Sequence, residues 1–187
     1  MMEQEPKEIA DRQIYETTIG PVCMSKTEYA IYQEEMAKRI GNLHIYVDAD
    51  ACPVVDLTVR EANKRQIPII LITDTSHVLN RTDAQIITVE KGSDSADFKL
   101  VNLVEKNDLV VTQDYGLAAM VLAKGGRALN QNGMIYSEQN MDTLLFTRHV
   151  AKKVRIAGGR TKGPHKRTKE QDEDFLRTLQ KMLEENI

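Results

Sequence analysis

The sequence lacks the features of a membrane protein and of a disulfide-stabilised secreted protein. No apolar stretch approaches the roughly 20 residues that a membrane-spanning helix needs, and the first residues, MMEQEPKEIADRQ, are acidic and lack the apolar core of a signal peptide. The two cysteines, Cys23 and Cys52, lie in different segments and are expected to be free thiols. No internal repeat or low-complexity segment is visible. We therefore expect a cytoplasmic protein that has no membrane partner.

Aromatic residues are also scarce, at 5% of the chain, and Phe146 is the only Phe, Tyr or Trp between Tyr136 and Phe175. A ladder of aromatic rings for stacking single-stranded bases is therefore not supported there. Asp and Glu are absent from residues 143–169, which carry 9 Lys and Arg. Residues 44–142, by contrast, carry 14 Asp and Glu against 9 Lys and Arg. An acidic body followed by an acid-free basic segment is an asymmetry that suggests an anionic partner.

What the chain does contain is typical of one globular domain with terminal additions. It has 187 residues, 41% of them hydrophobic and 28% charged. We predict an N-terminal extension over 1–42, an α/β domain over 43–157, and a basic glycine-rich loop with a C-terminal helix over 158–187 that packs on the same domain. Within the extension, residues 1–24 show no periodicity and read as a flexible arm, whereas Ser25 and Glu28 form a capping box for a helix that ends at Ile40.

From Leu43 onward, strand and helix patterns alternate. The segment PIILIT (68–73) is apolar throughout, as a strand covered on both faces should be. Alternating strands and helices predict a mainly parallel sheet with helices on both faces and with every strand-to-helix loop at one edge. The expected strands are 44–48, 68–73, 85–89 and 109–112, followed by a hairpin of 127–130 and 134–136. The expected helices are 53–65, 94–106, 115–124, 140–155 and 168–184.

Aspartates follow several of these strands at the edge where ligands bind in open α/β sheets. Asp48 and Asp50 follow the first strand, Asp114 follows the fourth, and Asp94 and Asp97 lie in the first turn of the helix after the third. Carboxylates gathered at this density raise one another's pKa, and a bound Mg²⁺ or Mn²⁺ relieves the repulsion. The alternative is that the aspartates separately cap helices or turns. We take all five as candidate metal ligands.

Such a site supports hydrolysis of phosphate esters, because metal ions polarise the phosphate and activate a bound water. The hydroxyls of Ser93 and Thr112 are candidates to orient ligands or water. A phosphatase of the haloacid-dehalogenase type is an alternative, because it also places D-x-D after its first strand and Thr after its second, as Asp48, Asp50 and Thr73 would be. A third alternative is a metal- or nucleic-acid-binding module without catalysis.

Several segments resemble those of a known family. The chain is similar to the YaiI/YqxD family of small bacterial proteins in VDADACPV (47–54), TSH (75–77), GSDSADF (92–98), LVVTQDYGLA (109–118), NQNGMIY (130–136) and RIAGGRTKGP (155–164). Members of this family look like relatives of PIN-domain nucleases. The resemblance implies a PIN-like three-layer α/β/α fold and metal-dependent cleavage of nucleic acid, with RNA as the substrate by analogy alone. It implies Asp48, Asp97 and Asp114 as the catalytic acids.

The chain departs from the family pattern at both ends. Residues 1–42 have no counterpart in that pattern. Near the C-terminus, Arg167 and Gln171 stand where the family tends to have an aromatic residue and an acid. We therefore do not expect the C-terminal segment to supply a catalytic acid.

The acid-free segment contains the candidate substrate-binding residues Arg155, Arg160 and Lys162. Lys and Arg bind phosphates, so a cationic loop beside a metal site suits a nucleic-acid substrate. The alternative is a solvated tail whose charge balances the acidic body. The oligomeric state does not follow from the sequence.

Overall fold

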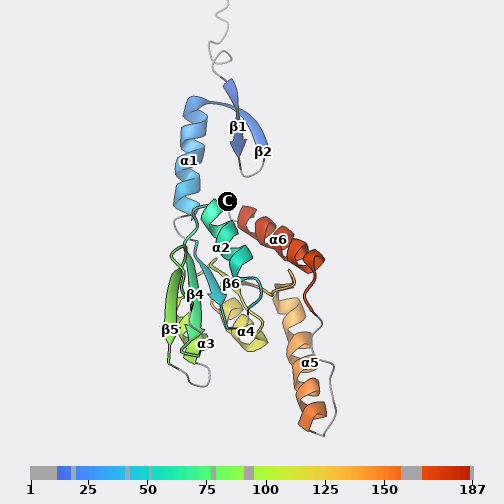
Figure 1. Cartoon of the computed structure of the whole chain (residues 1–187). Helices are drawn as coiled ribbons and strands as arrows, with labels where there is room; N and C mark the ends of the chain where they lie inside the picture. The colour runs from blue at the N-terminus through green and yellow to red at the C-terminus, as the bar shows by residue number, and fades with distance from the viewer. Residues whose placement is uncertain are drawn as a thin grey trace, which may run out of the picture.

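The central sheet has six strands in the order β5-β4-β3-β6-β7-β8 (Figure 1). The computed structural model describes residues 12–17, 20–40, 43–50, 52–76, 79–90, 95–156 and 166–185. The strands of this sheet are β3 (Ile45–Asp48), β4 (Ile69–Asp74), β5 (Gln85–Val89), β6 (Leu109–Val111), β7 (Arg127–Leu129) and β8 (Ile135–Tyr136). Neighbouring strands are parallel except β7 and β8, which form the predicted antiparallel hairpin. The prediction of a mainly parallel α/β sheet is confirmed.

Helices cover both faces of the sheet and enclose two hydrophobic clusters (Figure 1). The helices that follow strands of this sheet, and the C-terminal pair, are α2 (Val55–Lys64), α3 (Ser95–Leu103), α4 (Tyr115–Ala123), α5 (Glu138–Ile156) and α6 (Lys169–Glu184). Leu71 of β4 packs in the cluster that contains Val59 of α2 and Phe175 of α6. Ile70 packs in the other cluster, with residues of α3 and α4. Successive residues of β4 thus face opposite layers, which explains why the strand is apolar throughout.

The strand register sets the level of the side chains at the carboxyl edge. Val47 of β3 pairs with Val111 of β6, so the next residues, Asp48 and Thr112, lie at the same height. At the opposite end of the same two strands the fully buried Asp108 accepts hydrogen bonds from the backbone N–H groups of His44 (2.9 Å) and Glu105 (2.8 Å). Asp108 therefore fixes the start of β3 beside the start of β6.

The N-terminal extension differs from the prediction. Instead of an irregular arm up to Ser25, β1 (Arg12–Thr17) and β2 (Gly20–Ser25) form an antiparallel hairpin. It leads into α1 (Lys26–Ile40), and the predicted capping box is present, since Ser25 N–H donates to Glu28 and Glu28 N–H donates to the Ser25 hydroxyl. The rings of Tyr15 and Tyr29 stack with centroids 4.0 Å apart, which ties the hairpin to the helix.

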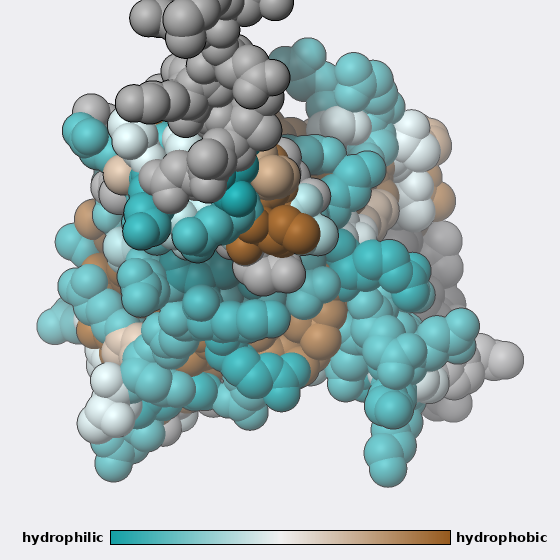
Figure 2. Space-filling view, turned by 90° about the horizontal axis from the view of Figure 1, so that it is seen from above, coloured by the Kyte–Doolittle hydropathy of each residue, from teal (hydrophilic) through white to brown (hydrophobic). Residues whose placement is uncertain are grey.

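The surface seen from the end that bears the N-terminal extension is mainly hydrophilic, with small hydrophobic patches (Figure 2). Within the described part of the chain, no helix has both the length and the apolar character needed to cross a membrane.

Candidate functional site

Two of the predicted aspartates are joined by one threonine. Asp48 ends β3, and Asp114 is the N-cap of α4, where its Oδ1 accepts from the N–H groups of Gly116 (2.6 Å) and Leu117 (3.1 Å). The hydroxyl of Thr112 donates to Asp48 Oδ2 over 2.8 Å and accepts from the N–H of Asp114 over 3.0 Å. Thr112 is buried, as the register at the end of β6 requires. The predicted orienting role of Thr112 therefore has a geometric basis.

Asp50 is anchored to the neighbouring strand. Its Oδ1 accepts from the hydroxyl of Thr73 over 2.6 Å, and its Oδ2 accepts from the N–H of Asp74 over 3.1 Å. Both oxygens therefore hold the loop after β3 against the end of β4. This arrangement makes Asp50 a support for the loop that follows β3, and its role as a direct metal ligand stays a prediction.

Negative charge accumulates around Asp48. Burial is the main cause that raises its pKa to about 6, and the charges of Asp97, Asp50 and Asp114 raise it further, while the hydrogen bond from Thr112 opposes the shift. Asp97 lies in the first turn of α3. Three aspartates, from three different strand-to-helix connections, thus act on Asp48 at one edge of the sheet. The charges of Asp97 and Asp114 thus both raise the pKa of Asp48, and the role of the three aspartates as metal ligands stays a prediction.

Arg148 of α5 supplies positive charge to this edge. Its Nη1 lies 3.1 Å from Oδ1 of Asp114 and its Nη2 lies 3.0 Å from Oδ2, a forked pairing of guanidinium and carboxylate. Burial raises the pKa of Asp114, but the hydrogen bonds from Arg148 and from the backbone N–H groups outweigh it, so the pKa lies below its ordinary value. The sequence alone does not single out Arg148 as a residue of the site. The acid-free segment indicates a cation near the site, but it does not indicate which one.

The donor set fits a divalent ion in its chemistry, because it consists of carboxylates that repel one another around a partly buried Asp48. Among the described residues, no three His, Cys, Asp or Glu side chains are grouped closely enough to hold an ion. Hydrogen bonds engage both oxygens of Asp50 and of Asp114.

Other predicted residues cannot be placed in the site. Ser93, Asp94, Arg160 and Lys162 lie outside the described residues. Arg155 lies in α5, two helical turns after Arg148, and its side chain is not described.

Two further side chains near the site have structural roles. Burial raises the pKa of the Cys52 thiol to about 11, so the thiol is protonated at neutral pH, and Cys52 packs against the hydrophobic core. In the C-terminal segment, Arg167 pairs with Asp172 over 2.5 Å. Asp172 is thus paired with a cation that lies close to it in the sequence.

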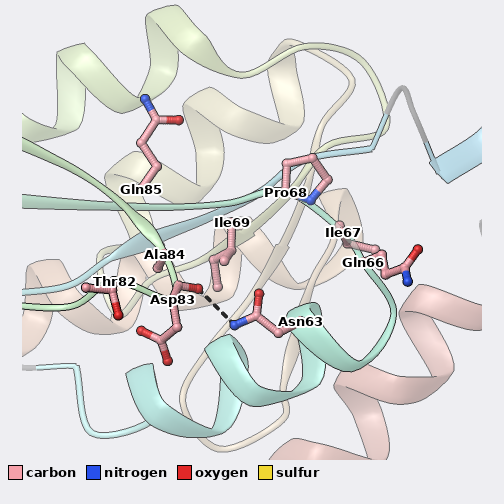
Figure 3. A pocket seen from close by; sticks show the side chains of 9 residues that line it. All are labelled: Asn63, Gln66, Ile67, Pro68, Ile69, Thr82, Asp83, Ala84 and Gln85. Carbon is pink, nitrogen blue, oxygen red and sulfur yellow. Dashed lines mark hydrogen bonds between the residues drawn. The ribbon is translucent and has the colours of Figure 1, made fainter.

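A shallow hollow of about 500 Å³ lies elsewhere, among the residues that precede β4 and β5 and the end of α2 (Figure 3). Polar and apolar side chains both line it, and Asn63 Nδ2 donates to the carbonyl oxygen of Asp83 across it over 2.8 Å. Because parallel strands begin at this edge, the hollow is at the opposite end of the sheet from the aspartates and is no part of their site.

The fold and the site define a three-layer α/β protein with clustered aspartates at the carboxyl edge of its sheet. Residues 46–185 match the model of a family described as "Uncharacterized BCR, YaiI/YqxD family", and the chain belongs to this family. It is 56% identical over 137 residues to a UPF0178 protein of Ruminiclostridium cellulolyticum, which covers 73% of this chain and 90% of that protein. It is 49% identical over 143 residues to a UPF0178 protein of Exiguobacterium sibiricum, covering 76% and 98%. No solved structure matches the chain.

Proposed function

We propose that this protein is a divalent-metal-dependent nuclease of the PIN-like type, which hydrolyses phosphodiester bonds in nucleic acid, with RNA as the substrate by analogy with that type. The observation that carries the proposal is the convergence of Asp97, Asp50 and Asp114 on the partly buried carboxyl of Asp48. Structural capping accounts for Asp114 alone, and anchoring accounts for Asp50 alone. Neither accounts for the position of Asp48, whose partly buried carboxyl lies among the charges of these other aspartates, and like charges cost stability unless a cation joins them.

In this proposal Asp48, Asp97 and Asp114 hold Mg²⁺ or Mn²⁺. The ion supplies polarisation of the phosphate and a water of lowered pKa. Thr112 keeps the carboxylate of Asp48 in one orientation through its 2.8 Å hydrogen bond, and Asp50 holds the loop that follows Asp48 in place. The basic segment, including Arg155, Arg160 and Lys162, binds the phosphates of the substrate and positions one of them at the site.

The test uses the substitutions Asp48→Asn and Asp114→Asn, with Asp142→Asn as the matched control on the exposed side of α5. We expect each site variant to cleave single-stranded RNA in the presence of Mn²⁺ at least about a hundredfold more slowly than the wild type. Removing a residue that only supports a metal ligand already lowers activity, and removing the ligand itself should lower it at least as much. Circular dichroism and thermal unfolding establish that each variant is folded. Wild-type activity in either folded site variant would refute the proposal.

The same preparations separate the proposal from the two alternatives. A phosphatase of the haloacid-dehalogenase type would form a phosphate ester on Asp48, which can be trapped by acid quenching after incubation with a labelled phosphomonoester. The nuclease forms no such intermediate. RNA binding by the wild type without cleavage in either Mg²⁺ or Mn²⁺ would favour the binding module.

A further inference from the structure

The N-terminal unit of β1, β2 and α1 buries few of its own side chains. It stands at one end of the molecule, apart from the central sheet (Figure 1). Of the side chains described in residues 12–34, only that of Met24 is buried, whereas Ile14 in the middle of β1 is 73% exposed. A two-stranded hairpin is marginally stable in water, and further strands with an apolar face, or a packed helix, stabilise it. The unit therefore has packing still to gain.

The helix α1 covers one face of the hairpin and leaves the other face open. Tyr15 of β1 stacks on Tyr29 of α1, with ring centroids 4.0 Å apart. Successive residues of a strand point to opposite faces, so Ile14, the neighbour of Tyr15, points away from α1. Its partner across the hairpin, Cys23, is exposed on the same open face.

Pro21 determines which edge of the hairpin can bind another strand. In an antiparallel pair, residue pairs that exchange hydrogen bonds alternate with pairs that do not, and Pro21 has no N–H to exchange with its partner Glu16. Counting in steps of two from there, Arg12, Ile14 and Glu16 direct their N–H and C=O groups away from β2. Among the described residues, β1 pairs with β2 alone, so this edge is open. The outer edge of β2 lacks the donor of Pro21, and a proline at an edge blocks further pairing.

The open edge of β1 is complementary to itself. If β1 pairs antiparallel with β1 of a second copy, around a twofold axis at Ile14, Arg12 stands opposite Glu16 of the second copy and Glu16 stands opposite Arg12. Residues of opposite charge at directly opposed positions stabilise the pairing of strands. The same register aligns the outward N–H and C=O groups of these residues for hydrogen bonds. Arg12 can also keep its contact with Glu28, because both hydrogen bonds to Glu28 come from Nη2 and a guanidinium has five N–H donors.

We propose that this protein forms a homodimer in which the two β1 strands pair along their open edges and make one four-stranded antiparallel sheet in the order β2-β1-β1-β2. The twofold axis is perpendicular to this sheet, so both copies of α1 cover the same face and Ile14 meets its counterpart on the other face. The blocked edge of β2 prevents addition of further copies, so the assembly closes at two chains. This inference goes beyond the proposed function and does not rest on it.

The first test measures mass by sedimentation velocity at up to about 100 μM protein, which is enough to populate a weak dimer. A reductant keeps the exposed Cys23 from cross-linking chains. We expect the wild type to have twice the mass of one chain, which is 21.2 kDa. Ile14→Pro removes an N–H that β2 does not use, so it should leave the hairpin paired and yield the mass of one chain. Cys23→Pro is the matched control, because Cys23 pairs with Ile14 but faces the opposite edge; this variant should remain a dimer.

Several outcomes of this test would overturn the inference. They are a wild type with the mass of one chain, a wild type with a mass above that of two chains, an Ile14→Pro variant that still dimerises like the wild type, and a Cys23→Pro variant that dissociates as readily as Ile14→Pro.

The second test exchanges charges and does not depend on proline. Arg12→Glu places like charges opposite each other in the dimer, and so does Glu16→Arg, so each variant alone should dimerise at least about tenfold more weakly than the wild type. In a mixture of the two variants, every opposed pair again joins opposite charges. Energy transfer between differently labelled chains should therefore show a mixed dimer at least about tenfold tighter than either variant forms with itself. Damage within one chain, such as the lost contact of Arg12 with Glu28, is not repaired by mixing. A mixed dimer no tighter than the self-association of each variant would thus reject the proposed pairing.

Discussion

Replacing Asp48 by asparagine should stabilise the ion-free fold, although the same change should abolish metal-dependent hydrolysis. The carboxyl of Asp48 is buried and surrounded by the charges of Asp97, Asp50 and Asp114, and its pKa is raised from 3.8 to about 6. An amide has the same size and carries no charge. Its oxygen can accept the hydrogen bond from Thr112, so the substitution removes the electrostatic penalty and keeps the local contact.

The magnitude follows from the pKa. A rise of about two pH units corresponds to roughly 3 kcal/mol of preference for the neutral form. Because Asp48 is partly exposed, solvent screening lowers the expected gain to about 2 to 3 kcal/mol at neutral pH. For a domain of this size, that gain corresponds to a rise in Tm of roughly 4 to 12 °C.

The pH dependence has a definite sign. The folded chain binds the Asp48 proton more tightly than the unfolded chain does, so this proton stabilises the wild type fully below about pH 4, and the stabilisation is lost as the pH rises through about 6. The advantage of Asp48→Asn over the wild type should therefore be near zero at about pH 4 and reach its full size above about pH 7.

The assay is urea unfolding followed by far-UV circular dichroism in EDTA across this pH range, with Asp142→Asn as the control for a change of net charge. A variant that is no more stable than the wild type at neutral pH would refute the argument, because it would mean that the ionised carboxylate of Asp48 is not in unfavourable surroundings. Mn²⁺ should reverse the order, because the ion stabilises only a protein that binds it.

Two further substitutions test the structure away from the site. Asp108→Ala leaves the buried N–H groups of His44 and Glu105 without their acceptors, so it should lower the free energy of unfolding by about 2 to 4 kcal/mol; a loss below about 1 kcal/mol in urea unfolding would contradict this role. Gly133→Ala places a Cβ 2.8 Å from the carbonyl oxygen of Asp174 at a φ of +81°, whereas Gly125→Ala, at a φ of +79°, meets no atom closer than 3.4 Å. Gly133→Ala should therefore destabilise by about 1 to 3 kcal/mol more than Gly125→Ala, and equal midpoints of thermal unfolding for the two variants would contradict the predicted clash.

The hairpin of β1 and β2 shows where local patterns mislead. Gly20 and Pro21 read as signals that break regular structure, and no alternation of apolar and polar residues marks the strands. In a two-stranded hairpin, however, both strands are edges, where proline is tolerated, and Pro21 pairs with Glu16. The stacking of Tyr15 on Tyr29, which joins the hairpin to α1, depends on residues from separate elements. Strand formation here is decided by such packing more than by intrinsic preference.

The sequence by itself determined the strands and helix caps that depend on interactions between residues close together in the chain. Burial on both faces requires the apolar run of β4, and the capping boxes at Ser25 and Thr168 involve residues three apart, so they could be read before any fold was known. The rule that parallel strands end at one edge was enough to predict that Asp48, Asp97 and Asp114 lie at that edge.

Only the tertiary structure decided the partners of those side chains. It joins Asp50 to Thr73, and it brings Arg148 to Asp114 from 34 residues further along the chain. Each pairing depends on the distance and angle between elements that are separate in sequence, and these follow from how the helices pack on the sheet. Residue type and spacing do not specify that packing. They therefore indicated an acidic edge and a basic segment, but not which charged side chains pair with each other.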